Sequence, residues 1–127
     1  MAKTALSLTP KEVESYRRAA LLAKPKRRDN LKARRLRSWR IARKAAKILK
    51  TEFGAEKVVV FGSLVHPVLF HDRSDVDLAV WGLKGREYYR AVSVLLDIEP
   101  TVSIDLIAFE DARRPVQDTI LKDGRKL

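Results

Sequence analysis

The chain of 127 residues carries a net charge of +11, and 46% of its residues are hydrophobic, so it can form one domain, or one small domain with a helical appendage. The absence of cysteine excludes disulfide bonds and thiolate metal sites and is compatible with a cytoplasmic protein, and two histidines are too few for a zinc site unless carboxylates contribute. No apolar run approaches the roughly 20 residues that span a bilayer, and the N-terminus lacks the apolar segment of a secretory signal, so no membrane partner is expected.

The first predicted element is a helix that runs from Pro10 to about Ala23. Thr9 is suited to cap its N-terminus, Pro10 fits the first helical position, and Glu12 is the third residue after the cap. Pro25 has no backbone N–H, and we expect it to end this helix.

A second, longer helix is predicted from about Leu31 to Phe53. Asp29 or Asn30 can cap its start, and Gly54 can end it. One side of this helix carries a rough apolar stripe, and cations fall largely on the other side. The stripe consists of Leu31, Leu36, Trp39, Ala42, Ala46, Leu49 and Phe53, and the cations are Arg40, Arg43, Lys44, Lys47 and Lys50.

The charge of the chain is concentrated in its first part. Residues 1–50 contain 17 Lys and Arg against 3 Asp and Glu, a net charge of +14, whereas residues 51–127 contain 10 against 13, a net charge of −3. Such a split favours an anionic partner for the first part, either an acidic protein or an RNA. The alternative is a solvated basic face without a partner.

From Lys57 onward, short β-branched runs alternate with helical spacing. The predicted strands cover residues 58–61, 76–81 and 102–109, and the predicted helices cover residues 86–96 and 113–122, with one helical turn before Pro67. In the helix over residues 86–96, Tyr89, Val92 and Leu96 lie on one side. This order implies an α/β (α+β) fold in which helices flank a small mixed β-sheet. We expect a basic helical extension over residues 1–54 and the main domain over residues 55–127.

Asp75 and Asp77 form the first candidate site. They lie two residues apart at the start of a predicted strand, so their carboxylates point to the same side. Like charges in this position raise each other's pKa, unless a divalent cation lies between them. Oxygen ligands without Cys or His suit Mg²⁺ or Mn²⁺. The alternative is a pair of solvated acids at a strand end.

Asp105 is the third candidate carboxylate. It interrupts the otherwise apolar strand Val-Ser-Ile-Asp-Leu-Ile-Ala-Phe, and aspartate is depleted in strands. Burial of an unpartnered carboxylate is costly, and this cost would be removed if Asp105 joined Asp75 and Asp77 around a metal ion. A buried salt bridge to Arg or Lys is the alternative.

Gly62 and Ser63 follow the first predicted strand directly. Glycine lets the backbone approach a ligand closely, and Ser63 can donate its hydroxyl and its N–H to a phosphate. The alternative is a simple turn that ends the strand. The order of strand, Gly-Ser, loop, Asp-x-Asp, helix and a strand with Asp is more specific than any single piece.

Together these motifs resemble a minimal nucleotidyltransferase of the DNA polymerase β superfamily. The matching segments are Val-Phe-Gly62-Ser63, Ser74-Asp75-Val-Asp77-Leu and Ile-Asp105-Leu-Ile, and the final helix also resembles that of the family. The resemblance implies a polymerase β palm-like fold in which Asp75 and Asp77 bind two metal ions, Asp105 joins them and activates the acceptor, and Gly62 and Ser63 hold the triphosphate.

The resemblance also implies an activity and partners. The superfamily transfers a nucleoside monophosphate, here AMP from ATP, to a protein or RNA acceptor and releases pyrophosphate. Many minimal members are antitoxins paired with a HEPN-type toxin. Two alternatives remain beside the enzyme, namely a non-catalytic module that neutralises a partner by contact and an RNA-binding protein that uses the basic helix. The sequence is also compatible with an oligomer.

The loop after Ser63 departs from the family pattern. Many members have an Arg-rich stretch there, whereas this chain has Leu64-Val65-His66-Pro67. An arginine that would steady phosphate charge is missing from the loop, and His66 or Arg73 is the candidate to compensate for it.

Overall fold

The computed structural model describes residues 8–22 and 25–127 of the chain. Its helices are α1 (Pro10–Leu22), α2 (Pro25–Glu52), α3 (Arg86–Leu96) and α4 (Arg114–Asp123), and its strands are β1 (Lys57–Phe61), β2 (Val76–Trp81), β3 (Ile104–Ala108) and β4 (Arg125–Lys126). Two short 3₁₀ turns, η2 (Gly62–Val65) and η3 (Phe109–Asp111), follow β1 and β3. The predicted helix end at Ala23 lies outside the described residues.

The start of α1 is as predicted from the sequence. The Glu12 N–H donates to Oγ1 of Thr9 at 3.2 Å, and the Thr9 N–H donates to Oε1 of Glu12 at 3.4 Å. This reciprocal pair satisfies backbone donors that the first helical turn leaves without partners. Apart from these cap contacts, most described side chains of α1 are exposed.

Helix α2 begins earlier than predicted. It starts at Pro25, so Asp29 and Asn30 lie inside the helix and the expectation that one of them caps it is wrong. The physical reason is that the first turn of a helix does not need the backbone N–H that proline lacks. Pro25 is therefore well suited to begin α2. The predicted end is confirmed, because α2 stops at Glu52 and Gly54 follows with a φ of 69°.

The four strands form one mixed sheet in the order β3-β2-β1-β4. Strand β1 is antiparallel to β2 and β4, whereas β2 and β3 are parallel. The short strand β4 was not predicted, and the return of the chain to β1 requires Gly124, because a Cβ there would collide with Val59 and with the Ile120 carbonyl.

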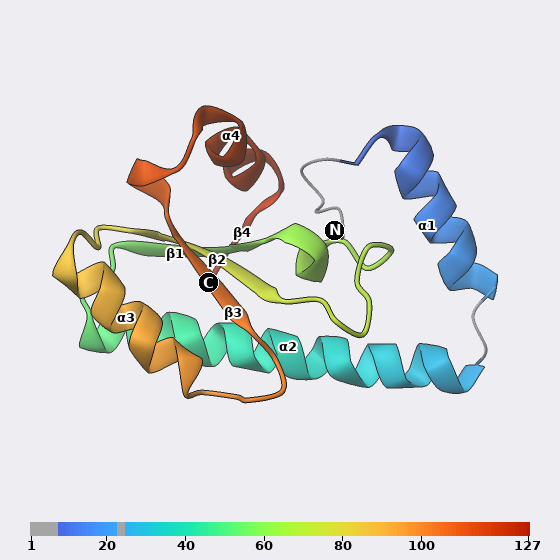
Figure 1. The fold of residues 1–127 in the computed structure, drawn as a ribbon, viewed down its shortest axis with the longest axis horizontal. Helices are drawn as coiled ribbons and strands as arrows, with labels where there is room; N and C mark the ends of the chain where they lie inside the picture. The colour runs from blue at the N-terminus through green and yellow to red at the C-terminus, as the bar shows by residue number, and fades with distance from the viewer. Residues whose placement is uncertain (1–7, 23–24) are drawn as a thin grey trace.

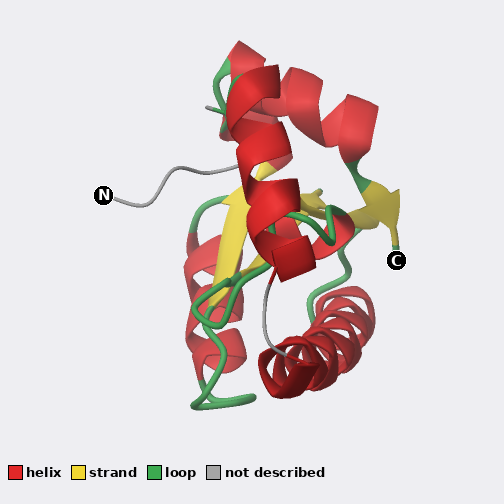
Figure 2. Ribbon diagram, turned by 90° about the vertical axis from the view of Figure 1, so that its right-hand side faces the viewer, coloured by secondary structure: helices red, strands yellow, loops and turns green. Residues whose placement is uncertain are grey.

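Helices cover both faces of this sheet. In Figure 1, α2 runs below the sheet and α4 lies above it, and Figure 2 shows the same layers from the side. Because strand side chains alternate, Val58 and Val60 pack in the core with α2 and α3, while Val59 and Phe61 pack with Ile120 of α4. The predicted fold class, a small mixed sheet flanked by helices, is confirmed.

Two details of helix packing differ from the sequence pattern. Leu36 of the predicted stripe is 56% exposed, and the buried residues of α3 are Ala91 and Leu95, whereas Tyr89 and Leu96 are exposed. The side of α3 that faces inward depends on the strand that it packs against, so the apolar positions of α3 alone did not predict that side.

No helix in the described ranges is long and apolar enough to cross a bilayer.

Candidate active site

The predicted carboxylates gather at one end of the sheet. Asp77 is the second residue of β2, and the strand register pairs it with Phe61 of β1 and with Asp105 of β3. Neighbouring strands are about 4.8 Å apart, so Asp77 and Asp105 are direct neighbours on the face that α4 covers further along. Asp75 lies one residue before β2, at the same end.

These carboxylates influence one another electrostatically. Burial, and then the negative charges of Asp105 and Asp75, raise the pKa of Asp77 to about 7. Partial burial and the charge of Asp105 also raise the pKa of Asp75, while Arg34 and His71 act in the opposite direction. The carboxylates therefore lie close enough for each charge to oppose the ionisation of the next.

Asp77 is partly buried and is the least exposed member of the group. Asp105 is exposed, so the expectation of a costly buried carboxylate at this position is wrong. The reason is that β3 is an edge strand of the sheet. Within the described residues Asp105 forms no ion pair, which also argues against the alternative of a structural salt bridge.

The donor chemistry of this end fits a hard divalent cation. Carboxylate oxygens suit Mg²⁺ or Mn²⁺, and a cation would relieve the repulsion that, after burial, raises the pKa of Asp77. In residues 8–22 and 25–127, however, no three His, Cys, Asp or Glu side chains are already arranged to hold a metal ion. The aspartates share one end of the sheet without forming a finished coordination site.

Gly62 lies directly against Asp77. Its φ is 78°, a conformation that other residues rarely adopt, and a Cβ at this position would collide with Oδ2 of Asp77. Gly62 also begins η2, the turn that carries Ser63. The predicted Gly-Ser turn and the predicted Asp-x-Asp pair are therefore in direct contact.

Two arginines of α2 also reach this end, and sequence reasoning did not assign them a role. Arg35 donates from Nε and Nη2 to the Leu64 carbonyl of η2, at 3.3 and 3.0 Å. Arg34 donates from Nη1 and Nη2 to the Thr101 carbonyl at 3.4 and 3.3 Å. Both lie in a dense basic run, so no local signal distinguishes them from solvated cations.

The profile described as polymerase beta, nucleotidyltransferase, matches residues 43–127. The chain belongs to the polymerase β nucleotidyltransferase family. This assignment confirms the resemblance of the sequence motifs to a minimal nucleotidyltransferase domain.

A solved structure has a similar fold. It is the crystal structure of the toxin–antitoxin complex MntA–HpeT in a mutant form, which matches with a TM-score of 0.55 and 18% identity over 67% of this chain and 70% of that chain. At this identity the likeness supports the nucleotidyltransferase fold. No curated protein matches the chain.

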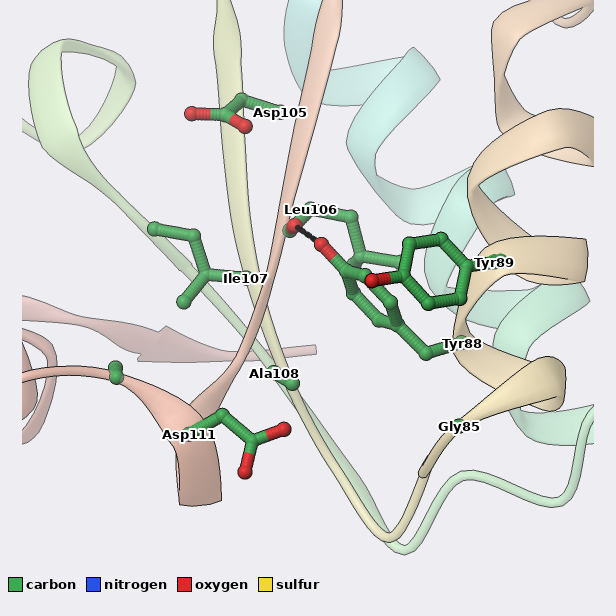
Figure 3. A pocket seen from close by; sticks show the side chains of 9 residues that line it. Gly85, Tyr88, Tyr89, Asp105, Leu106, Ile107, Ala108 and Asp111 are labelled. Atoms are coloured by element: carbon green, nitrogen blue, oxygen red, sulfur yellow. Dashed lines mark hydrogen bonds between the residues drawn. The ribbon is translucent and has the colours of Figure 1, made fainter.

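The domain has a cavity of about 510 Å³ beside its edge strand β3, next to Asp105. Figure 3 shows Tyr88 and Tyr89 of α3 facing β3 across this cavity, with Asp111 at its lower end. The Tyr88 hydroxyl donates to the Leu106 carbonyl at 2.6 Å and so fixes its ring beside the strand. Burial, and then the charge of Asp105, raise the pKa of Tyr88.

The two side chains expected to compensate for the missing loop arginine lie in different surroundings. Nε2 of His66 is 3.8 Å from Oδ2 of Asp123 on α4, and this carboxylate would offset any charge on the imidazole. Arg73 is exposed, and its backbone N–H donates to Nδ1 of His71 at 3.1 Å. Neither side chain contacts η2 as Arg35 does.

Proposed function

We propose that this chain is a metal-dependent nucleotidyltransferase that transfers a nucleoside monophosphate, AMP from ATP, to a protein or RNA acceptor. The observation that carries the proposal is the neighbouring position of Asp77, Asp105 and Gly62 at one end of the sheet of a polymerase β family domain. A cluster of like charges is unfavourable for stability, so its presence beside Gly62 favours a role in binding.

Asp75 and Asp77 would hold Mg²⁺ or Mn²⁺, with Asp105 as a third ligand or as the base. When bound, such ions offset negative charge on the triphosphate and on the leaving pyrophosphate, and they lower the pKa of an attacking hydroxyl. Mutual repulsion already disfavours three separate charges here, which supports a cation as their counter-charge.

Asp105 is the best placed of the three for the acceptor, because it is exposed on the edge strand and lines the cavity. In the proposed reaction the acceptor oxygen forms a bond to the α-phosphorus. The bond from this phosphorus to the oxygen that bridges the α- and β-phosphates breaks, and pyrophosphate leaves. The hydroxyl proton passes to Asp105 or to water.

Gly62 and Ser63 would hold the triphosphate. The Asp77 carboxylate occupies the space where a Cβ of residue 62 would lie. A side chain at position 62 would therefore disturb both the turn and the proposed metal ligand. We expect Gly62→Val to abolish measurable ATP binding in a protein that still folds. Unchanged affinity by calorimetry would count against this role.

A toxin–antitoxin role is the proposed biological setting. The similar solved structure is a mutant toxin–antitoxin complex with two Asp-to-Glu substitutions two positions apart, the spacing of Asp75 and Asp77. We propose that this chain is an antitoxin with a toxin of the HEPN type as its partner and AMP acceptor.

The basic surface of α2 favours a second candidate function, binding of an anionic partner. Arg40, Arg43 and Lys47 are exposed, and none of them forms an ion pair with another described residue. Such a surface suits an acidic protein or an RNA, with affinity that falls as salt rises.

Incubation with labelled ATP, Mg²⁺ and co-purifying partners tests the proposal. We expect a labelled protein or RNA with the natural chain, none with Asp77→Asn, and undiminished label with Asp118→Asn, a matched change at an exposed aspartate of α4. Undiminished labelling by Asp77→Asn would overturn the proposed site. Mg²⁺-dependent ATP binding without any labelled product would instead favour the antitoxin that acts by contact.

A further inference from the structure

Arg35 connects the basic helix α2 to the turn that follows β1. Two of its guanidinium nitrogens share one acceptor, the Leu64 carbonyl, over a sequence separation of 29 residues. Leu64 is itself fully buried in the core cluster, and it is the third residue of η2, which begins with Gly62. The turn is therefore fixed both by the buried Leu64 side chain and by the two hydrogen bonds that the charged Arg35 guanidinium donates to the Leu64 carbonyl.

The positive charge of Arg35 is not neutralised by the contact it makes. A carbonyl is a neutral acceptor, and no carboxylate in residues 8–22 or 25–127 lies within ion-pair distance of Arg35. Arg125 of β4 is close enough to oppose the charge, because it and partial burial lower the pKa of Arg35. The Arg35 guanidinium therefore lies beside the turn without an acidic partner among the described residues.

An anion at the turn would be stabilised by this arrangement. A triphosphate brings several negative charges to an end of the sheet that already carries Asp75, Asp77 and Asp105, so cations are needed in addition to any metal. Arginine is suited to this position because it stays charged when partly buried and keeps its planar fork oriented by the carbonyl.

We propose that Arg35 is the positioning residue of the nucleotide site, which orders the Gly62–Val65 turn through the Leu64 carbonyl and supplies positive charge to the triphosphate. This inference rests on the proposed function, since the nucleotide is the ligand that the turn would hold. It also assigns to α2 a direct part in the site, beyond the packing of its second half against the sheet.

Calorimetry of ATP with Mg²⁺ tests the proposal on Arg35→Ala, Arg35→Lys and the control Arg28→Ala, which removes an exposed arginine of the same helix. We expect affinity to fall at least tenfold in Arg35→Ala and to recover to within about threefold of the natural chain in Arg35→Lys, because lysine keeps the charge and one donor. Arg28→Ala should bind as the natural chain does. Equal affinity in Arg35→Ala and the natural chain would overturn the proposal and leave the proposed function standing.

Hydrogen exchange without nucleotide separates the two hypotheses. Amides of residues 62–66 should exchange at least tenfold faster in Arg35→Ala than in the natural chain, while amides of β2 should be unchanged. If the natural chain does not bind ATP, the proposed function fails, and faster exchange still supports the positioning role. Unchanged exchange would overturn that role whatever the binding result.

Discussion

The two ends of the β1–β2 pair have opposite character. At one end Phe61 pairs with Asp77, and carboxylates repel one another beside Gly62, which has a positive φ. At the other end Lys57 pairs with Trp81, the Lys57 ammonium lies 4.7 Å from the Trp81 ring, and Trp81 stacks on Phe109 at 4.3 Å. The contacts at the Lys57–Trp81 end stabilise the fold. The carboxylates at the Phe61–Asp77 end repel one another, so a positively charged ligand would stabilise that end.

Substitution at the carboxylate end should separate activity from folding most strongly. We expect Asp77→Asn to lower nucleotide transfer on the order of 100-fold or more, because it removes a charged ligand from the reacting centre. Transfer rates measured beside an unfolding curve would check this. A variant that loses activity only because it unfolds would break the comparison between the two ends.

The pH dependence of stability should also come from the carboxylate end. The raised pKa of Asp77 means that the folded state holds its proton between about pH 4 and pH 7, while the unfolded state has released it. The free energy of unfolding of the metal-free protein should therefore fall as pH rises through this range, by up to about 4 kcal/mol from this group alone, at about 1.4 kcal/mol per pKa unit.

The matched variant for this titration is Asp77→Asn, which cannot ionise. Its unfolding curves at pH 8 should show higher stability than the natural chain, and the difference should disappear near pH 4. A natural chain that gains stability between pH 5 and pH 7 relative to this variant would contradict the electrostatic account.

At the opposite end, the largest effect should be on stability. Trp81→Ala removes the stacked ring and its contact with Lys57, so we expect a loss of about 3 kcal/mol in the free energy of unfolding, with ATP affinity nearly unchanged in the folded fraction. Denaturant unfolding and calorimetry measure the two quantities. If Trp81→Ala lost ATP binding but kept its stability, the Lys57–Trp81 end would have the binding role assigned here to the carboxylate end.

The smallest expected effect lies on the basic surface of α2. Charge reversal at Arg40, Arg43 and Lys47 should weaken binding of an acidic protein or RNA partner about tenfold at low salt, and the difference should shrink as salt rises. ATP affinity should remain within about twofold, because these side chains are exposed and away from η2. Unchanged partner affinity after charge reversal would favour the alternative that this basic surface is solvated and binds no partner.

Local patterns predicted the strand end that carries the site. The bounds of β2 follow from the two-residue period of a strand, and the Asp-x-Asp pair and the Gly-Ser turn became candidates because each lies at the end of a predicted strand. These features depend on residues close together in the sequence, which explains why they could be predicted.

Long-range contacts were beyond the same reasoning. Arg34 and Arg35 meet carbonyls 67 and 29 residues away, and nothing near them in sequence marks this. Exposure of Asp105 follows from the edge position of β3, and the inward side of α3 follows from what it packs against. In each case the partner lies on another element, whose position the local pattern does not contain.

The central claim is that the carboxylate end binds a nucleotide through a metal ion. Calorimetric titration of the natural chain with ATP at pH 8, with Mg²⁺ and with a chelator, measures this. We predict binding that requires Mg²⁺ and is lost in Asp77→Asn, while Asp118→Asn binds normally. ATP binding of equal strength without Mg²⁺, or undiminished in Asp77→Asn, would contradict the account.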